Sequence, residues 1–333
     1  MIIAVPVDFA DATLTAEMAD DLAAVEAALR DTSFGGDEMF ADVSRHMMAA
    51  GGKRFRAMLV LLAARCGDPR DKRIVPAAVA IELTHLAALF HDDVMDEAVI
   101  RRGHPSANSQ FGNSIAILAG DHLFARASRI LADLGPAAIR IQAETFGRLV
   151  DGQLLETVGL RPGDDPLDHY MRVINGKTGS LIATSGRFGA MFSGVSDEMT
   201  DLIAEACLRI GIAWQLSDDV LDVASTSTQS GKEPGTDLRQ GVRTLPVLYA
   251  LRGDVATPEA ARLRELLTDG DLADPELHAE ALALLRQSPA LEEARETVRS
   301  WISGATALLA KLPDVPARTA FESLCDFVIT RTA

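Results

Sequence analysis

The chain has 333 residues, of which 48% are hydrophobic and only 5% aromatic, and its formal net charge at pH 7 is −16. This length suits one large domain or two ordinary ones, and the apolar content is sufficient for a sizeable core. The negative charge argues against a nucleic-acid-binding protein, because such proteins present basic surfaces to the phosphate backbone. Any anionic ligand must therefore be bound by local basic clusters or through bound cations.

Alanine and leucine dominate the sequence, and regular alternation of apolar and polar residues does not persist, which predicts an all-α protein. Glycine- and proline-rich turns divide the chain into segments of helical length. The sequence contains no linker-like or repeated stretch, so we expect one large helical bundle over residues 1–333. The predicted helices span 15–31, 37–50, 53–66, 73–98, 107–133, 137–158, 166–175, 178–192, 197–224, 240–252, 257–268, 275–286, 290–311 and 316–331.

The sequence indicates a soluble, cytoplasmic protein. The apolar stretches 57–66 and 77–90 are too short or too polar to span a bilayer, so no transmembrane segment is expected. The first residues lack the basic region of a signal peptide. The three cysteines are far apart and lie in apolar helical contexts, which is typical of reduced, buried thiols.

The first candidate binding site is the turn 51–56, GGKRFR, which opens a predicted helix with three cations. Cations at a helix N-terminus oppose the helix dipole. A bound anion would remove this conflict, because both the backbone N–H groups and the basic side chains would contact it. Lys53 and Arg56 are therefore candidate anion-binding residues, and the alternative is a solvated basic turn.

An aspartate motif, DDxxD, follows at 92–96 on an apolar predicted helix. Asp92 and Asp96 lie one turn apart on one face of that helix, with Asp93 beside them. Carboxylates this close repel each other by up to ~4 kcal/mol per pair at an effective dielectric of 20. A buried cluster therefore needs a cation, and Mg²⁺ accepts a few carboxylates while keeping water and phosphate oxygens as its other ligands. The alternative is a solvated acidic helix.

The same pattern recurs at 164–168, DDPLD, after a proline-glycine turn. Asp165 and Pro166 have the residue types of an N-cap and a first helical position. We therefore interpret this match as helix capping and surface charge.

A third match, DDVLD at 218–222, belongs to a polar stripe on an otherwise apolar helix. Such a stripe must face a cavity, because a buried unpaired charge is too costly. Two helices of this kind, facing one another, would bind several Mg²⁺ ions and hold a diphosphate between them. The residues of the stripe are Gln215, Asp218, Asp219 and Asp222.

Further side chains near these motifs are candidates for contacts with the same phosphates. Arg101 and Arg102 follow the first motif by about two turns. His85 lies two turns before Asp92 on the same helix face, although a lone histidine is more often a core residue. The remaining basic and hydroxyl candidates are Lys177, Thr178 and Lys232.

Taken together, these motifs resemble those of the trans-type polyprenyl diphosphate synthases, the family of farnesyl and geranylgeranyl diphosphate synthases. The resemblance covers residues 51–251 in the family's order and spacing. It implies an all-α isoprenoid synthase fold around a central cavity, usually in a homodimer. The matching stretches are GGKRFR, HDDVMDEAVIRRGHPSAN, GDHLFARA, KTGSLIATS, QLSDDVLD and GKEPGTDLRQGVRTLPVLYAL.

The resemblance also implies the reaction, which is head-to-tail condensation of isopentenyl diphosphate with a dimethylallyl, geranyl, farnesyl or geranylgeranyl diphosphate, releasing pyrophosphate. Three Mg²⁺ ions per active site would be bound through Asp92, Asp96 and Asp218, with Asp93, Asp219 and Asp222 nearby. The allylic diphosphate would contact Arg101, Lys177 and Lys232. Isopentenyl diphosphate would contact Lys53, Arg56, His85 and Arg102. The residues beside the reacting carbons would be Thr178 and Gln215.

In this family the residues just before the first aspartate motif help to form the floor of the product cavity. Here Ala87 and Ala88 are small and Thr84 is not aromatic, so Phe124 is the nearest candidate for a floor. One helical turn rises ~5.4 Å, close to the length of one isoprene unit. We therefore expect an all-trans product of at least C20, and the small residues favour C25 to C40. One departure from the family is Val242, where many members have lysine.

Three rival interpretations use the same residues differently. A terpene cyclase would not need Lys53 and Arg56 and typically lacks the second aspartate motif. A non-catalytic subunit of a heteromeric synthase would normally have lost one of the two motifs. A helical scaffold with acidic surfaces would make every motif a coincidence.

Overall fold

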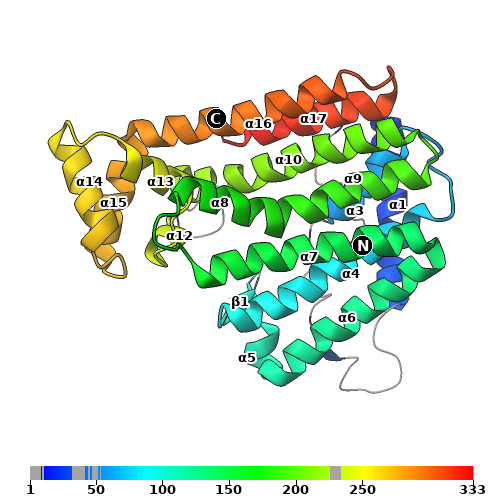
Figure 1. The fold of residues 1–333 in the computed structure, drawn as a ribbon, viewed down its shortest axis with the longest axis horizontal. Helices are drawn as coiled ribbons and strands as arrows, with labels where there is room; N and C mark the ends of the chain where they lie inside the picture. The colour runs from blue at the N-terminus through cyan, green and yellow to red at the C-terminus, as the bar shows by residue number, and fades with distance from the viewer. Residues whose placement is uncertain are drawn as a thin grey trace. The chain divides into compact units, whose positions relative to one another are not determined.

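The computed structural model describes residues 9, 11–31, 42–43, 46, 52, 54–101, 103–225 and 234–332. Within these ranges the regular secondary structure is helical apart from one short pair of strands (Figure 1), which confirms the all-α prediction. Most of the predicted helix 37–50 lies outside the described residues, as do Lys53, Arg102 and Lys232. The elements are α1 (Ala12–Asp31), α3 (Phe55–Ala64), α4 (Ile74–Met95), β1 (Ile100–Arg101), β2 (His104–Pro105), α5 (Ala107–Phe111), α6 (Asn113–Leu134), α7 (Pro136–Val158), α8 (Pro166–Ile174), η1 (Asn175–Gly179), α9 (Ser180–Phe192), α10 (Asp197–Ala224), α12 (Thr236–Arg239), α13 (Leu245–Arg252), α14 (Pro258–Asp269), α15 (Pro275–Gln287), α16 (Pro289–Leu309) and α17 (Pro316–Thr330).

The chain divides into two compact units. Unit 1 comprises 1–147, 181–207 and 309–323, and unit 2 comprises 148–180, 208–308 and 324–333. The units interleave along the sequence, and α7, α10 and α17 each contribute residues to both. The prediction of a single domain over 1–333 stays a prediction.

Helix α4 is the core of unit 1. It packs along α6 and also contacts α1, α3 and α5 (Figure 1). Apolar side chains lie on every side of α4, as expected of a helix surrounded by protein, and Ile81 and Phe90 are fully buried. In the described part of the chain, α4 is the one helix long and apolar enough to cross a membrane, but 72% of its apolar window is buried inside the protein. These features are those of a core helix.

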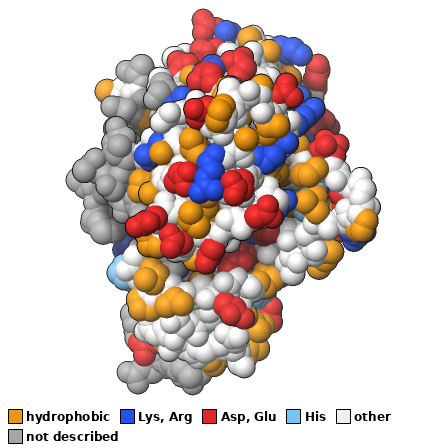
Figure 2. Space-filling model, turned by 90° about the vertical axis from the view of Figure 1, so that its left-hand side faces the viewer, with side chains coloured by type: hydrophobic (Ala, Val, Ile, Leu, Met, Phe, Trp, Pro, Cys, Tyr) orange, Lys and Arg blue, Asp and Glu red, His pale blue; other side chains and the backbone are white. Residues whose placement is uncertain are grey.

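Unit 2 is organised around the second half of α10. The guanidinium of Arg286, on α15, donates to the carbonyl oxygens of Val223 (2.7 Å) and Ser225 (2.8 Å), which binds α15 to the end of α10. Helix α13 packs against α8 and α14, and α14 packs against α15. Figure 2 shows the face carrying α14 and α15, where acidic and basic side chains lie next to one another. Arg262 pairs there with Glu280 at 2.8 Å.

The helices agree closely with those predicted, with three informative differences. The predicted helix 107–133 is divided at Gly112, whose φ of 86° lies in the left-handed region that glycine tolerates. The predicted start at 240 is wrong, because Thr244 is extended and α13 begins only at Leu245, just before Pro246. The predicted break between 166–175 and 178–192 is instead a helical turn of π type, η1.

Candidate functional site

The first aspartate motif ends helix α4, and its three carboxylates have different surroundings. Asp92 is half-buried and Asp96 is exposed at the C-cap, whereas Asp93 is fully buried. The Oδ1 atom of Asp93 accepts a hydrogen bond from Arg101 Nε at 2.6 Å. The middle aspartate therefore anchors the β1 strand to the end of α4, and Arg101, predicted to contact a diphosphate, is held beside the motif.

The second oxygen of Asp93 fits a cation or a water molecule. Asp93 Oδ2 is buried without a hydrogen-bond partner, and an unsatisfied buried acceptor normally has an ion or a water as its partner. Among the described residues, no three acidic, histidine or cysteine side chains converge into a site made by protein alone. Mg²⁺ does not require such a site, because it keeps water and phosphate oxygens as ligands.

The basic turn before α3 is only partly available to a ligand. Arg54 is 5% exposed and adopts a left-handed φ of 48°, and its Nε donates to Glu26 at 2.8 Å. Glu82 also pairs with Arg54 at 3.7 Å and accepts the Ala57 N–H at 3.0 Å. Protein carboxylates thus balance Arg54, the one cation of this turn that was not predicted to bind an anion. Arg56 is half-buried in the first turn of α3.

In unit 2, the outer aspartates of the second motif are accessible but engaged. Asp218 is exposed and pairs with Arg331, which follows α17. The Arg331 guanidinium lies 4.4 Å from the centroid of the Trp214 ring, a cation–π contact that fixes its position. The Asp222 carboxylate accepts the N–H groups of Thr236 and Asp237 at 3.1 and 3.2 Å, the first helical residues of α12.

The middle aspartate of this motif, Asp219, is 3% exposed and accepts hydrogen bonds from three neighbours. Tyr170 Oη and the Leu245 N–H donate to Oδ2, the latter at 3.4 Å. Gln215 Nε2 donates to Oδ1 at 3.3 Å, and the Oε1 atom of Gln215 accepts from Thr178 Oγ1 at 3.3 Å. Burial raises the pKa of Asp219 to about 7, although these hydrogen bonds act to lower it. Burial also raises the pKa of Tyr170 well above its usual value.

The π-type turn η1 carries both Lys177 and Thr178. Lys177 pairs with Glu156 on α7. The turn lies directly against α7, because a Cβ added to Gly152 would be 2.7 Å from the Lys177 backbone nitrogen, and one added to Gly176 would be 2.8 Å from Gly152 Cα. Turns of this type are frequent at functional sites. Two glycines therefore permit the backbone approach that positions Lys177 and Thr178.

The match at 164–168 caps a helix, as predicted. Asp165 is the N-cap of α8 and accepts the N–H groups of Leu167 and Asp168, each at 2.9 Å, with Pro166 following it. Asp164 accepts the Arg161 N–H at 3.0 Å.

The residues expected to set product length lie in unit 1. Ala87 and Ala88 are buried on α4, and Thr84 accepts a hydrogen bond from Gln142 Nε2 at 2.6 Å. The ring of Phe124 lies 4.1 Å, between centroids, from that of Phe146. His85 is half-buried on the same helix.

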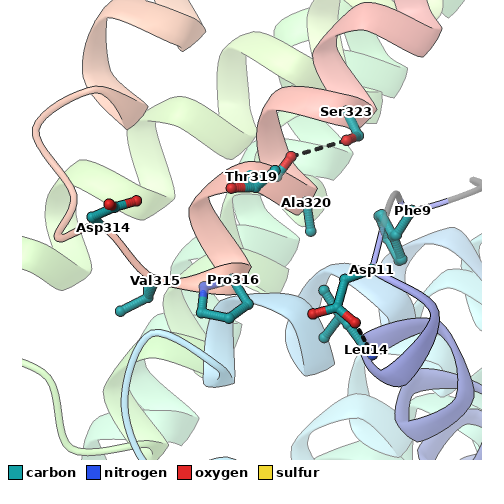
Figure 3. Close-up of a pocket in the computed structure, with 9 residues that line it drawn as sticks. All are labelled: Phe9, Asp11, Leu14, Asp314, Val315, Pro316, Thr319, Ala320 and Ser323. Carbon is teal, nitrogen blue, oxygen red and sulfur yellow. Dashed lines mark hydrogen bonds between the residues drawn. The ribbon is translucent and has the colours of Figure 1, made fainter.

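Two further hollows help to delimit the site. One in unit 1 has a volume of about 430 Å³ and lies between the starts of α1 and α17 (Figure 3). Its charged lining residues among those described are Asp11 and Asp314, so it does not suit a diphosphate. In unit 2, Val242 is 47% exposed and lines a hollow of about 320 Å³ with Arg239 and Arg243. Two arginines therefore border the position where the family often has lysine.

Sequence reasoning missed Tyr170, Gly152 and Arg331. Tyr170 is one of only two tyrosines in the chain, and a rare phenol near a motif is a signal for a buried hydrogen bond. Arg331 is 113 positions from its partner Asp218, and no local pattern indicates such a pair.

Residues 37–285 match the family model described as Polyprenyl synthetase. The chain is 47% identical over 326 residues to a nonaprenyl diphosphate synthase of Mycobacterium tuberculosis, covering 98% of this chain and 96% of the relative. It is 35% identical over 312 residues to heptaprenyl diphosphate synthase component 2 of Geobacillus stearothermophilus, covering 93% and 96%. A crystal structure of a geranylgeranyl pyrophosphate synthase from Corynebacterium glutamicum, complexed with calcium and isoprenyl diphosphate, matches with a TM-score of 0.88 at 44% identity, covering 98% of this chain and 100% of that chain.

Proposed function

Because the chain belongs to the polyprenyl synthetase family, we propose that aspartates of both motifs bind divalent cations and, through them, an allylic diphosphate. The protein is a prenyltransferase that condenses isopentenyl diphosphate with an allylic diphosphate and makes an all-trans polyprenyl diphosphate of C20 or longer. The observation that carries this conclusion is the family match over 37–285, which includes both intact aspartate motifs.

The donor sets fit Mg²⁺. The outer aspartates of each motif are half-buried or exposed, so water and diphosphate oxygens can complete the coordination. A relative crystallised with calcium and isoprenyl diphosphate supports a divalent ion. Three Mg²⁺ ions per active site, when bound, would offset the charge of the departing diphosphate. The proposed ligands are Asp92, Asp93, Asp96, Asp218 and Asp222.

The basic residues would divide between the two diphosphates. Charge-assisted hydrogen bonds to phosphate are the strong ones, and negative charge grows on the leaving group as the allylic C–O bond breaks. Arg101, Lys177 and Lys232 would bind the allylic diphosphate. The isopentenyl diphosphate would be bound by Lys53, Arg56, His85 and Arg102.

At the reacting carbons, Thr178 and Gln215 would present oxygen atoms toward the developing allylic cation. Such fixed dipoles stabilise a transition state without reorganising during the reaction. The double bond of isopentenyl diphosphate attacks the cation, and the proton then lost goes to the departing pyrophosphate. No described side chain is needed as the base.

We place the product within C25 to C40. The small, buried side chains of Ala87 and Ala88 on α4 support this range, and the paired rings of Phe124 and Phe146 in the same unit would form the floor of the product cavity. Thr84, the next proposed chain-length residue on α4, is held in place by the hydrogen bond from Gln142.

The chain is proposed to act in the cytoplasm as a homodimer. Exposed apolar side chains support a second copy of the chain covering these surfaces. They lie on α6 (Ile117, Leu118) and, separately, on α7 (Val150, Leu154, Val158). A heteromeric enzyme is the second candidate, because one relative is named as component 2 of a heptaprenyl diphosphate synthase.

Incubating the purified chain alone with Mg²⁺, labelled isopentenyl diphosphate and each allylic primer separates these possibilities. The expected product is a labelled polyprenyl diphosphate of C20 or longer. A hydrocarbon formed without isopentenyl diphosphate would indicate a cyclase. Inactivity alone, with activity restored by a second chain, would indicate a heteromer.

A further inference from the structure

Three structural elements of unit 2 meet at one buried carboxylate. Asp219 on α10 accepts from Tyr170 on α8, from the backbone N–H of Leu245 at the start of α13, and from Gln215 one turn earlier on α10. Its side chain is therefore surrounded by donors and not by the open space that a metal ligand needs. In this respect Asp219 differs from Asp218, which is exposed.

The hydrogen bonds define which way the Gln215 amide points. When Asp219 is ionised its two oxygens only accept, whereas a glutamine amide has a donating NH₂ group and an accepting oxygen. The NH₂ group must therefore face Asp219, at 3.3 Å, and Oε1 must face Thr178, whose hydroxyl donates to it at 3.3 Å. The opposite orientation would bring two acceptor oxygens together at Asp219.

We propose that Asp219, held by Tyr170, is a positioning residue that orients the Gln215 amide with its oxygen toward Thr178. This inference rests on the proposed function, in which Gln215 and Thr178 lie beside the reacting carbons. There the oriented oxygen stabilises the developing allylic cation, and the reversed amide would present its positive end. Tyr170 is connected to Gln215 and Thr178 in two ways. Its hydroxyl donates to Asp219, which binds Gln215, and its helix α8 continues directly into the turn that carries Thr178.

Replacing the carboxylate by an amide of the same shape tests the orientation. The amide of Asp219→Asn has only one acceptor oxygen, whereas Tyr170 and the Leu245 N–H donate on one side and Gln215 donates on the other. The new NH₂ group must therefore face one of these donors unless the Gln215 amide reverses. Adding Gln215→Glu restores the pairing, since the amide at position 219 donates to one oxygen of the new carboxylate and the other oxygen faces Thr178. Removal of one oriented dipole typically lowers kcat by about 10²- to 10³-fold.

The experiment measures single-turnover rates, KM and the Mg²⁺ concentration giving half-maximal rate. Asp219→Asn is expected to slow the single turnover by about 10²-fold with KM and Mg²⁺ dependence unchanged, and Asp219→Asn/Gln215→Glu is expected to recover most of this loss. Tyr170→Phe should lower the rate, whereas Tyr249→Phe, which removes a hydroxyl bonded to Thr297 at 2.8 Å, should not. Failure of the double variant to recover, or a large rise in the Mg²⁺ requirement of Asp219→Asn, would overturn the proposal.

A measurement independent of turnover separates this inference from the proposed function. The side-chain NH₂ protons of Gln215, observed by NMR, should exchange slowly in the wild type and rapidly in Asp219→Ala. Equal exchange in the two proteins would overturn the orientation even if the enzyme is active. Slow exchange in an inactive wild type would support the orientation and reject the proposed function alone.

Discussion

Replacing Gly152 tests whether the close packing of the η1 turn on α7 controls catalytic activity. Substitution with alanine adds a Cβ that would lie 2.7 Å from the Lys177 backbone nitrogen and 3.0 Å from the carbonyl carbon and Cα of Gly176. Ordinary contacts of a Cβ begin near 3.4 Å. The neighbours are backbone atoms that cannot rotate away, so the turn must move by about 0.7 Å relative to α7.

This movement displaces Lys177 and Thr178 together. A misplacement of about 1 Å at a reacting centre can lower the rate by about 10²-fold, so Gly152→Ala should lower kcat by roughly 10- to 100-fold. Overpacking should destabilise the fold by about 1–3 kcal/mol, offset by about 1 kcal/mol gained from the helix propensity of alanine over glycine. Steady-state kinetics and thermal unfolding measure the two effects.

Gly147, on the same helix, provides the matched control. A Cβ added there meets no atom within 4 Å, so Gly147→Ala should leave kcat unchanged and stabilise the fold by up to about 1 kcal/mol. If Gly152→Ala retained the kcat and unfolding temperature of the wild type, the close packing of η1 on α7 would not control the site. Equal losses in both variants would also refute the reasoning.

Four other substitutions test the assignments of the site. Asp92→Ala should lower kcat by several orders of magnitude with the unfolding temperature nearly unchanged. Asp164→Ala, which removes a turn hydrogen bond from the Arg161 N–H, should do almost nothing, and comparable losses would reject the interpretation of 164–168 as capping and surface charge. Arg56→Ala should raise KM for isopentenyl diphosphate far more than KM for the allylic substrate, and the reverse would show that the two diphosphate sites are exchanged. Ala88→Phe should shorten the product toward C15 in a chromatographic assay, and an unchanged length would place the cavity floor elsewhere.

Most helices could be predicted from the sequence because residue types close to each end determine where the helix begins or stops. Pro166, Pro275 and Pro316 each open a helix at its first position, and Asp165 and Asp274 cap two of them through their side chains. These signals act within a few residues and do not depend on tertiary contacts.

The parts that could not be predicted depend on distant partners. A helical projection places Asp93 and Asp219 beside the outer aspartates, yet both point into protein, where Arg101 and Tyr170 meet them. Gly176 looks like a helix breaker in the sequence, but the chain continues through it because Gly152 on α7 leaves space for a wider turn. In each case the deciding contact lies on another element.

The ratio of pyrophosphate released to polyprenyl chains formed tests the central claim most directly. Each condensation releases one pyrophosphate, so the purified chain, supplied with Mg²⁺, dimethylallyl diphosphate and excess isopentenyl diphosphate, should release at least three per product of C20 or longer. The same reaction with Asp218→Ala should release almost none. A wild-type ratio of one or two, or pyrophosphate release that needs no isopentenyl diphosphate, would contradict the assignment as a synthase of products of C20 or longer.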